Sequence, residues 1–273
     1  MSPALFETRR GSLPILISFP HSGTYLPEAL RERFTALGRE LPDTDWFVPE
    51  LYRGCLERLG VSSLIATHSR YVVDLNRPAD GAALYPGQIE SAVCPTETFS
   101  GVAIYRAGHE LLATETRERC ERYWRPYHQA LGELRDEILA IHGRCLIWDA
   151  HSIRSLAPRL FDGQLPELNL GTWSGRSAGA QLVGRVVALI GAQQRFSHVV
   201  NGRFKGGWIT RHYGQPTLGV HALQMELACR SYMHEPPMPG PDNWPTPFDP
   251  TLVRATQRTL ADVLASALAW ART

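Results

Sequence analysis

Short apolar runs alternate along this chain with longer amphipathic stretches, and this alternation limits the folds that the chain can adopt. The runs at 13–19 (LPILISF), 61–67 (VSSLIAT) and 144–148 (RCLIW) have the length of buried strands. Ile and Val cluster again at 196–200 and 218–227. Strands that alternate with helices predict an α/β layer architecture.

Residues with helical spacing separate these runs. The segment 48–59 places apolar side chains at helical intervals, and 250–270 is typical of a closing amphipathic helix. The segment 107–141 predicts a helix that Pro126 should break or kink. The run 70–75 (RYVVDL) alternates weakly and predicts a further strand. Because no repeat or long linker occurs, we expect residues 1–273 to form a single domain.

The composition excludes several classes of partner. With 28 Lys and Arg against 27 Asp and Glu, the net charge of +1 gives no electrostatic reason to expect nucleic acid or a membrane surface. The first residues lack the layout of a signal peptide, and no apolar run reaches the ~18 residues of a membrane span. The five cysteines are scattered without a CxxC pair, which favours a cytoplasmic protein. We therefore expect a small-molecule partner.

Polar residues follow three of the predicted strands. His21 comes after the first strand, His151 after a central strand, and Glu226 near the end of a late one. In open α/β sheets, ligands bind beyond the carboxyl ends of the strands. Neutral imidazole is the commonest ligand of catalytic divalent ions, so the two histidines predict two of the usual three protein ligands. The alternative for each is a turn histidine that bonds to the backbone.

The segment 42–46 (PDTDW) offers a carboxylate as the third ligand. Aspartate commonly caps a helix by accepting backbone N–H groups, and we expect Asp43 to do so. That leaves Asp45 as the preferred ligand, with Glu50, one helical turn beyond it, as the second choice. The predicted metal ligands are therefore His21, Asp45 and His151.

Two arginines and an asparagine cluster in the segment 69–78 (SRYVVDLNRP). The guanidinium fork matches a carboxylate, and its charge suits a developing oxyanion. Arg70, Asn76 and Arg77 are therefore candidate site residues. The alternative is a strand flanked by ordinary surface salt bridges.

Together these segments resemble the N-formylglutamate amidohydrolase family, which is related to the zinc carboxypeptidases and aspartoacylases. This resemblance implies a central, mixed, mostly parallel sheet with helices on both faces. The matching segments are PHSGTYLP (20–27), DTDWFVPELY (43–52), SRYVVDLNRP (69–78), LYPGQ (84–88), PTETFSG (95–101), DAHS (149–152), GGWITRHYG (206–214) and QMEL (224–227).

The resemblance also implies residue roles. His21 and His151 match metal-binding histidines, and Arg70 matches the arginine that polarises the scissile carbonyl. Asn76 and Arg77 match a pair that grips a substrate carboxylate.

Later segments complete this implied site. Glu226 falls where the general base of the superfamily lies. In the segment 206–214, we expect Thr210 and Arg211 to bind substrate, with Arg211 binding a second carboxylate. Related enzymes carry a glutamate three residues after the first histidine, where this chain has Thr24, and Asp45 is expected to substitute for it.

The implied reaction is metal-dependent hydrolysis of N-formyl-L-glutamate to formate and L-glutamate, a step of histidine degradation. One divalent ion is expected, zinc or alternatively cobalt. A related N-acyl amino-acid deacylase, a carboxypeptidase-like hydrolase and a non-catalytic dicarboxylate-binding module are the competing hypotheses. Neither a GxSxG elbow nor a cysteine nucleophile motif occurs. The stretch 79–105, rich in Gly and Pro, is a candidate lid.

Overall fold

The computed structural model describes residues 2–271. In this part of the chain, the strands are β1 (Phe6–Arg9), β2 (Ile15–Phe19), β3 (Ser62–Ala66), β4 (Cys145–Ile153), β5 (Leu168–Gly171), β6 (His198–Val200) and β7 (Val220–Ala228). They form one seven-stranded sheet in the order β1-β3-β2-β4-β7-β5-β6. The central strands β3, β2, β4 and β7 are parallel, whereas β1 pairs antiparallel with β3 and β5 pairs antiparallel with β7.

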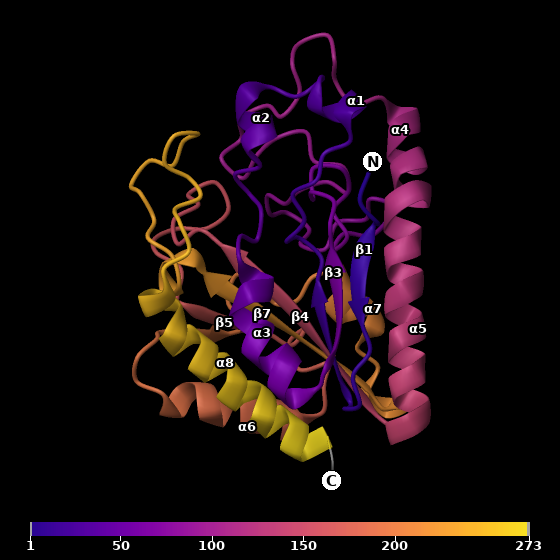
Figure 1. Ribbon diagram of the computed structural model, residues 1–273, viewed down its shortest axis with the longest axis vertical. Coiled ribbons are helices and arrows are strands. Elements are labelled where there is room, and N and C mark those ends of the chain that lie inside the picture. The colour runs from indigo at the N-terminus through magenta and orange to yellow at the C-terminus, as the bar shows by residue number, and fades with distance from the viewer. Residues whose placement is uncertain (1, 272–273) are drawn as a thin grey trace.

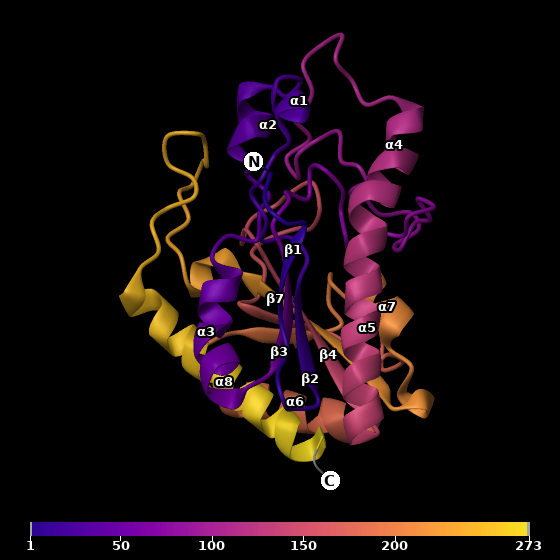
Figure 2. The same ribbon diagram turned by 45° about the vertical axis from the view of Figure 1, so that its right-hand side comes forward.

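Helices cover both faces of this sheet. They are α1 (Glu28–Arg31), α2 (Ala36–Glu40), α3 (Val48–Leu59), α4 (Ala113–Arg119), α5 (Arg125–His142), α6 (Ala180–Ala192), α7 (Trp208–Tyr213) and α8 (Pro250–Ala271). Helices α3, α6 and α8 pack on one face, and α5 and α7 lie on the other (Figures 1 and 2). The predicted mixed, mostly parallel sheet with helices on both faces is confirmed. None of the helices within residues 2–271 is long and apolar enough to cross a bilayer.

Side chains of the central strands alternate between two hydrophobic cores. In β4, Leu146 and Trp148 face the core beneath α3, α6 and α8, whereas Cys145 and Ile147 face the core beneath α5 and α7. This is the two-residue period of a strand. All nine residues of β4 and all nine of β7 are buried, as expected for parallel strands covered on both faces. The sheet is therefore a rigid platform for the groups at its carboxyl edge.

Most of the predicted elements are confirmed. The runs 13–19, 61–67 and 144–148 contain β2, β3 and the first part of β4, and the two helical segments are α3 and α8. Strand β4 continues to Ile153, so His151 lies within the strand and not after it.

The prediction of a strand at 70–75 is wrong. These residues form turns, in which the Val72 N–H donates to Ser69 O and the Asp74 N–H donates to Val93 O. Both edges of the neighbouring strand β3 are already paired, with β1 and β2. The apolar side chains of the run are instead buried in the core beneath α5.

The predicted interruption near Pro126 takes the form of a π turn. Residues 107–112 are not helical, and α4 passes through the π turn η1 (Cys120–Trp124) into α5, along one side of the molecule (Figure 1). Pro126 lies in the first turn of α5. Its ring nitrogen has no hydrogen to donate to the carbonyl four residues earlier, which explains why the regular ladder changes there.

Candidate active site

The parallel register brings the predicted site residues to one edge of the sheet. His151 on β4 lies opposite Glu226 on β7, and Asp149 lies opposite Ser18 on β2. His21 follows the end of β2 by two residues. The Asp45 N–H donates to the His21 carbonyl at 3.0 Å, which ties the loop before α3 to the same edge.

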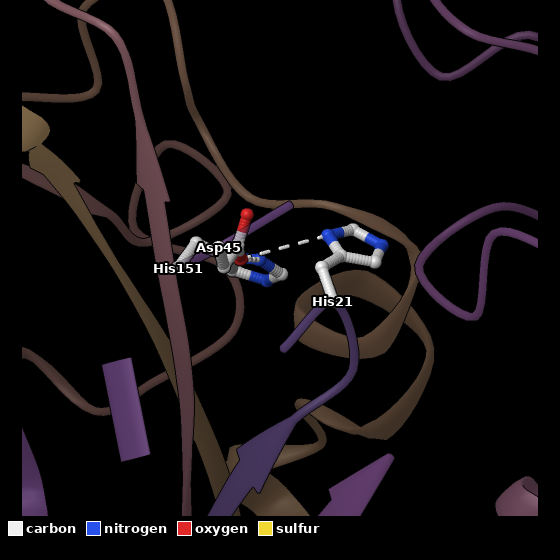
Figure 3. Close-up of side chains that lie close together, drawn as sticks. All are labelled: His21, Asp45 and His151. Carbon is white, nitrogen blue, oxygen red and sulfur yellow. Dashed lines mark hydrogen bonds and ion pairs between the residues drawn. The ribbon is translucent and has the colours of Figure 1, made fainter. Parts of the chain in front are cut away.

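His21, Asp45 and His151 point toward one another (Figure 3). One candidate ligand atom from each residue lies within 4.8 Å of the others, and all three side chains are buried. The Nδ1 atoms of His151 and His21 lie 3.0 and 3.8 Å from Asp45 Oδ2. The three residues predicted as metal ligands are thus gathered in one cluster.

Each imidazole contacts one buried aspartate through its Nε2 atom. His21 Nε2 lies 2.7 Å from Asp74 Oδ1, and His151 Nε2 lies 3.0 Å from Asp149 Oδ2. A carboxylate in this outer position fixes the tautomer and leaves the other ring nitrogen free to bind a cation. The sequence reasoning missed both aspartates, although Asp149 shares the face of β4 with His151, two residues away.

The cluster fits a divalent cation. Asp45, Asp74 and Asp149 are almost fully buried, and Arg70 Nη2 donates to Asp74 Oδ2 at 2.6 Å. Asp45 Oδ1 and Asp149 Oδ1 are buried without a hydrogen-bond partner among the described residues, although Arg70 Nη1 lies 3.9 Å from Asp45 Oδ1. Unpaired buried carboxylate oxygens are costly unless a cation balances them.

The charges within the cluster shift the pKa values of its members. Burial lowers the pKa of His21, and the Arg70 charge lowers it further. Burial also opposes the charged form of His151, but Asp149 and Asp45 hold its pKa well above the ordinary value. Burial alone would raise the pKa of Asp74, yet His21 and Arg70 hold it well below its usual range. The cluster therefore favours the neutral form of His21 and the charged form of His151.

Glu226 is the carboxylate best placed for proton transfer. It lines the same cavity as His21 and His151, and its Oε2 accepts a hydrogen bond from Gln224 Nε2 at 3.0 Å. Burial raises the pKa of Glu226 to about 7. A general base works best when its pKa lies near the working pH.

Asp43 does not cap a helix, so that prediction is wrong. Its Oδ2 accepts hydrogen bonds from Tyr71 Oη at 2.6 Å and from the Phe99 N–H at 2.8 Å. The N-cap of α3 is Phe47, which makes no side-chain cap. The Phe99 ring lies beneath the Arg70 guanidinium, 4.7 Å from its carbon. Asp43 thus holds in place the Phe99 segment on which the Arg70 guanidinium packs.

The first turn of α7 donates two hydrogen bonds to Asn76. The Ile209 N–H donates to Asn76 Oδ1 at 2.8 Å, and the Trp208 N–H donates to the Asn76 carbonyl at 3.2 Å. Asn76 Nδ2 lies 2.8 Å from both Asp149 Oδ2 and His151 Nε2. The Asn76 side chain therefore contacts Asp149 and His151 and helps to orient them.

Of the remaining predicted site residues, only some line the cavity. Arg77 lines the cavity, whereas Thr210 is fully buried and does not line it. Arg211 does not line the cavity; its guanidinium donates to the carbonyls of Gly206 and Leu84. Glu50, the second choice as a ligand, lies in a separate surface depression. Substrate binding by Thr210 and Arg211 stays a prediction.

The cavity in front of the cluster has a volume of about 580 Å³, including the part open to solvent. Part of its wall comes from the stretch 79–105, through Tyr85, Glu90 and Phe99. Arg203 also lines it, and the sequence reasoning missed this residue. Its segment NGRFKGG carries no signal beyond adjacent glycines.

The mixed sheet and the buried polar cluster at its carboxyl edge define an α/β enzyme that acts on a small molecule. Residues 13–233 match the family model described as N-formylglutamate amidohydrolase. This chain belongs to the N-formylglutamate amidohydrolase family.

Relatives of known sequence support the same assignment. The chain is 45% identical to the N-formylglutamate deformylase of Pseudomonas aeruginosa over 97% of this chain and 96% of that protein. It is 42% identical to the N-formylglutamate deformylase of Pseudomonas putida over 96% and 94% of the two chains.

Solved structures share the fold. The crystal structure of N-formylglutamate amidohydrolase from Ralstonia eutropha JMP134 superposes with a TM-score of 0.79 at 23% identity, covering 98% of each chain. A gene product of Agrobacterium tumefaciens superposes with a TM-score of 0.72 at 15% identity, covering 99% of this chain and 97% of that one.

Proposed function

We propose that this chain hydrolyses N-formyl-L-glutamate to formate and L-glutamate, as a step of histidine degradation. The observation that carries the proposal is the buried cluster of His21, Asp45 and His151, of which the two histidines line one cavity with Glu226 and with arginines. Relatives that match nearly the whole chain are named N-formylglutamate deformylase. The reaction adds one water across the C–N bond of the formamide.

His21, Asp45 and His151 would hold one divalent cation. Two imidazoles and a carboxylate are a common donor set for catalytic zinc, and cobalt is the alternative. When bound, such an ion lowers the pKa of a water molecule toward ~7 and polarises the formyl carbonyl. Asp74, Asp149 and Asn76 are positioning residues, because they hold the histidine rings in place.

Glu226 and Arg70 are the proposed catalytic residues. Glu226 accepts the proton of the attacking water and passes it to the departing amine nitrogen. Arg70 donates hydrogen bonds to the oxygen that becomes negative in the tetrahedral state. Arg77 binds a carboxylate of the substrate.

Location in the cytoplasm and a single domain over residues 1–273 are parts of this proposal. All five cysteines are buried and free, which supports a reducing compartment. One sheet with a core on each face supports a single folding unit.

A comparison of acyl groups tests the substrate. We expect purified protein to act on N-formyl-L-glutamate about 10- to 200-fold faster, in kcat/KM, than on N-acetyl-L-glutamate, because one extra methyl group has an effect of this size in a fitted pocket. Equal turnover of the acetyl compound would favour a general N-acyl deacylase. Binding of the formyl compound without formate release would favour a dicarboxylate-binding module.

A further inference from the structure

Arg203 lines the cavity, and its guanidinium forms no ion pair with a carboxylate of the described residues. The cavity is lined by three arginines: Arg70, Arg77 and Arg203. Arg70 pairs with Asp74 at 2.6 Å, and Arg77 Nε lies 4.0 Å from Glu90 Oε2. Within residues 2–271, Arg203 has no carboxylate oxygen within 4.0 Å. A half-buried guanidinium that forms no ion pair within the protein favours the binding of an anionic group of a ligand.

The protein holds the Arg203 guanidinium in a fixed orientation. Its Nε donates to the Leu160 carbonyl at 2.7 Å, and its Nη2 donates to the Ile89 carbonyl at 2.9 Å. The rings of Tyr85 and Phe204 lie 5.2 and 5.4 Å from its central carbon. Both bonds go to neutral carbonyl groups, so the positive charge is kept, and Nη1 has no protein partner within the described residues. Such pre-organisation lowers the entropy lost when a ligand binds.

The local electrostatics favour an anion at this position. Burial lowers the pKa of Arg203, Tyr85 opposes that effect, and the nearby charge of Arg77 lowers the pKa further. The charges of Glu90 and Glu226 offset only part of this effect, since the pKa of Arg203 stays lowered, and the Glu90 carboxylate accepts the N–H groups of Leu84 and Tyr85. A carboxylate bound to Arg203 would offset this penalty.

The chemistry of the substrate assigns the two arginines to different carboxylates. In an N-formyl amino acid, the α-carboxylate is attached to the carbon that carries the scissile amide, whereas a glutamate side chain separates its carboxylate from that carbon by two methylene groups. Arg77 follows Asn76, which touches His151 of the cluster. Arg203 instead contacts Leu160, Ile89 and Phe204, none of which hydrogen-bonds to the cluster.

We propose that Arg203 binds the side-chain carboxylate of the substrate and thereby selects acidic N-formyl amino acids over neutral ones. In this proposal Arg203 has the role of binding the second carboxylate, which the sequence analysis gives to Arg211; the Arg211 guanidinium donates to the carbonyls of Gly206 and Leu84. This inference rests on the proposed deformylase function.

The test compares N-formyl-L-glutamate with N-formyl-L-glutamine, its uncharged isostere. We expect the unmodified protein to prefer the glutamate compound by about 10- to 100-fold in kcat/KM, the effect of one charge-assisted hydrogen-bond pair. In Arg203→Gln this ratio should fall to near one, through a higher KM for the glutamate compound, while turnover of the glutamine compound changes little. Arg203→Lys, which keeps the charge but lacks the planar fork, should give an intermediate ratio.

Arg39→Gln is the matched control, because Arg39 Nε also bonds to a carbonyl, that of Arg31, and lies outside the cavity. Its substrate ratio should be unchanged. An equal loss on both substrates in Arg203→Gln and Arg203→Lys, or an unchanged ratio in both, would overturn the role of Arg203. If the unmodified protein released formate from neither compound, the proposed function itself would fail.

Discussion

Two aspartates determine which nitrogen of each histidine faces the centre of the site. Asp74 and Asp149 contact the Nε2 atoms of His21 and His151, respectively, so that both Nδ1 atoms face Asp45. Removal of such an outer carboxylate typically weakens metal binding 10- to 100-fold. Each predicted metal-binding histidine is therefore paired with an aspartate that orients its ring.

Glu226→Gln should separate catalysis from metal binding. Without a base, we expect kcat for formate release to fall by about 10²- to 10⁴-fold. Metal content should stay unchanged, because Glu226 is not part of the His–Asp–His cluster. Steady-state kinetics and elemental analysis of the same preparation measure both quantities.

Glu50→Gln is the control for this change. Glu50 lies outside the cavity, so its variant should keep both metal and activity. Full turnover by Glu226→Gln would remove Glu226 from the role of base, and loss of metal in Glu50→Gln would revive Glu50 as a ligand.

Single residues were predictable where local sequence placed them at the ends of strands. His21 and His151 were found in this way, whereas Asp45 was chosen as a carboxylate of the segment 42–46, and the structure gathers all three. Asp149 and Gln224 carried a usable signal, since each lies two residues from a predicted site residue on a strand. Arg203 carried no such signal, because its place in the cavity depends on how its loop packs against distant loops.

At the scale of elements, the short helix α7 matters more than its length suggests. Its first N–H groups bond to Asn76, and the Gly207 N–H donates to Gln224 Oε1 at 2.7 Å. Gln224 in turn donates to Glu226. One turn of helix thus orients both the cluster and the proposed base.

Gly207→Ala should disrupt this arrangement. A Cβ atom at Gly207 would lie 2.4 Å from Asn76 Nδ2, closer than real contacts allow. We expect a loss of about 1–3 kcal/mol in the free energy of unfolding and a clear fall in kcat/KM, because Asn76 must move away from His151. Urea denaturation and formate release measure the two effects.

Gly184→Ala provides the matched change in α6. A Cβ atom there meets nothing within 4 Å, so we expect unchanged activity and a gain of about 0.5–1 kcal/mol. Wild-type activity and stability in Gly207→Ala would show that α7 does not hold Asn76 in place.

The elements themselves were largely predictable because their periodicity is local. The run 70–75 was not, because an apolar run becomes a strand only where a neighbouring strand has a free edge. The length of β4 was underestimated for a similar reason: Asp149 and His151 are polar, yet the paired neighbours β2 and β7 keep them in the sheet.

At the scale of the whole molecule, His128 joins α5 to the loop that carries the site. Its Nε2 lies 2.9 Å from the Leu75 carbonyl, and its Nδ1 lies 3.3 Å from Tyr213 Oη on α7. Burial lowers the pKa of His128 to about 3. The folded protein therefore holds this imidazole in its neutral form.

Stability should depend on pH through His128. The unfolded chain protonates this residue near pH 6.5 and the folded chain only near pH 3, so the stabilisation is fully present above pH 6.5 and is lost as the pH falls toward 3. The slope should reach about 1.4 kcal/mol per pH unit. Urea denaturation between pH 7.5 and pH 4.5 measures it.

His128→Gln, which can still donate to Leu75 O, should remove this part of the slope. His221, whose pKa burial lowers to about 4, contributes in the same direction and should account for part of what remains. An unchanged slope in the variant would show that His128 is not the titrating group.

The most direct test of the account is formate release from N-formyl-L-glutamate by the purified protein before and after chelation. We expect release to fall to background when the metal is removed, and to return when one equivalent of zinc or cobalt per chain is added. Full activity in protein shown to be metal-free by elemental analysis would contradict the role assigned to His21, Asp45 and His151.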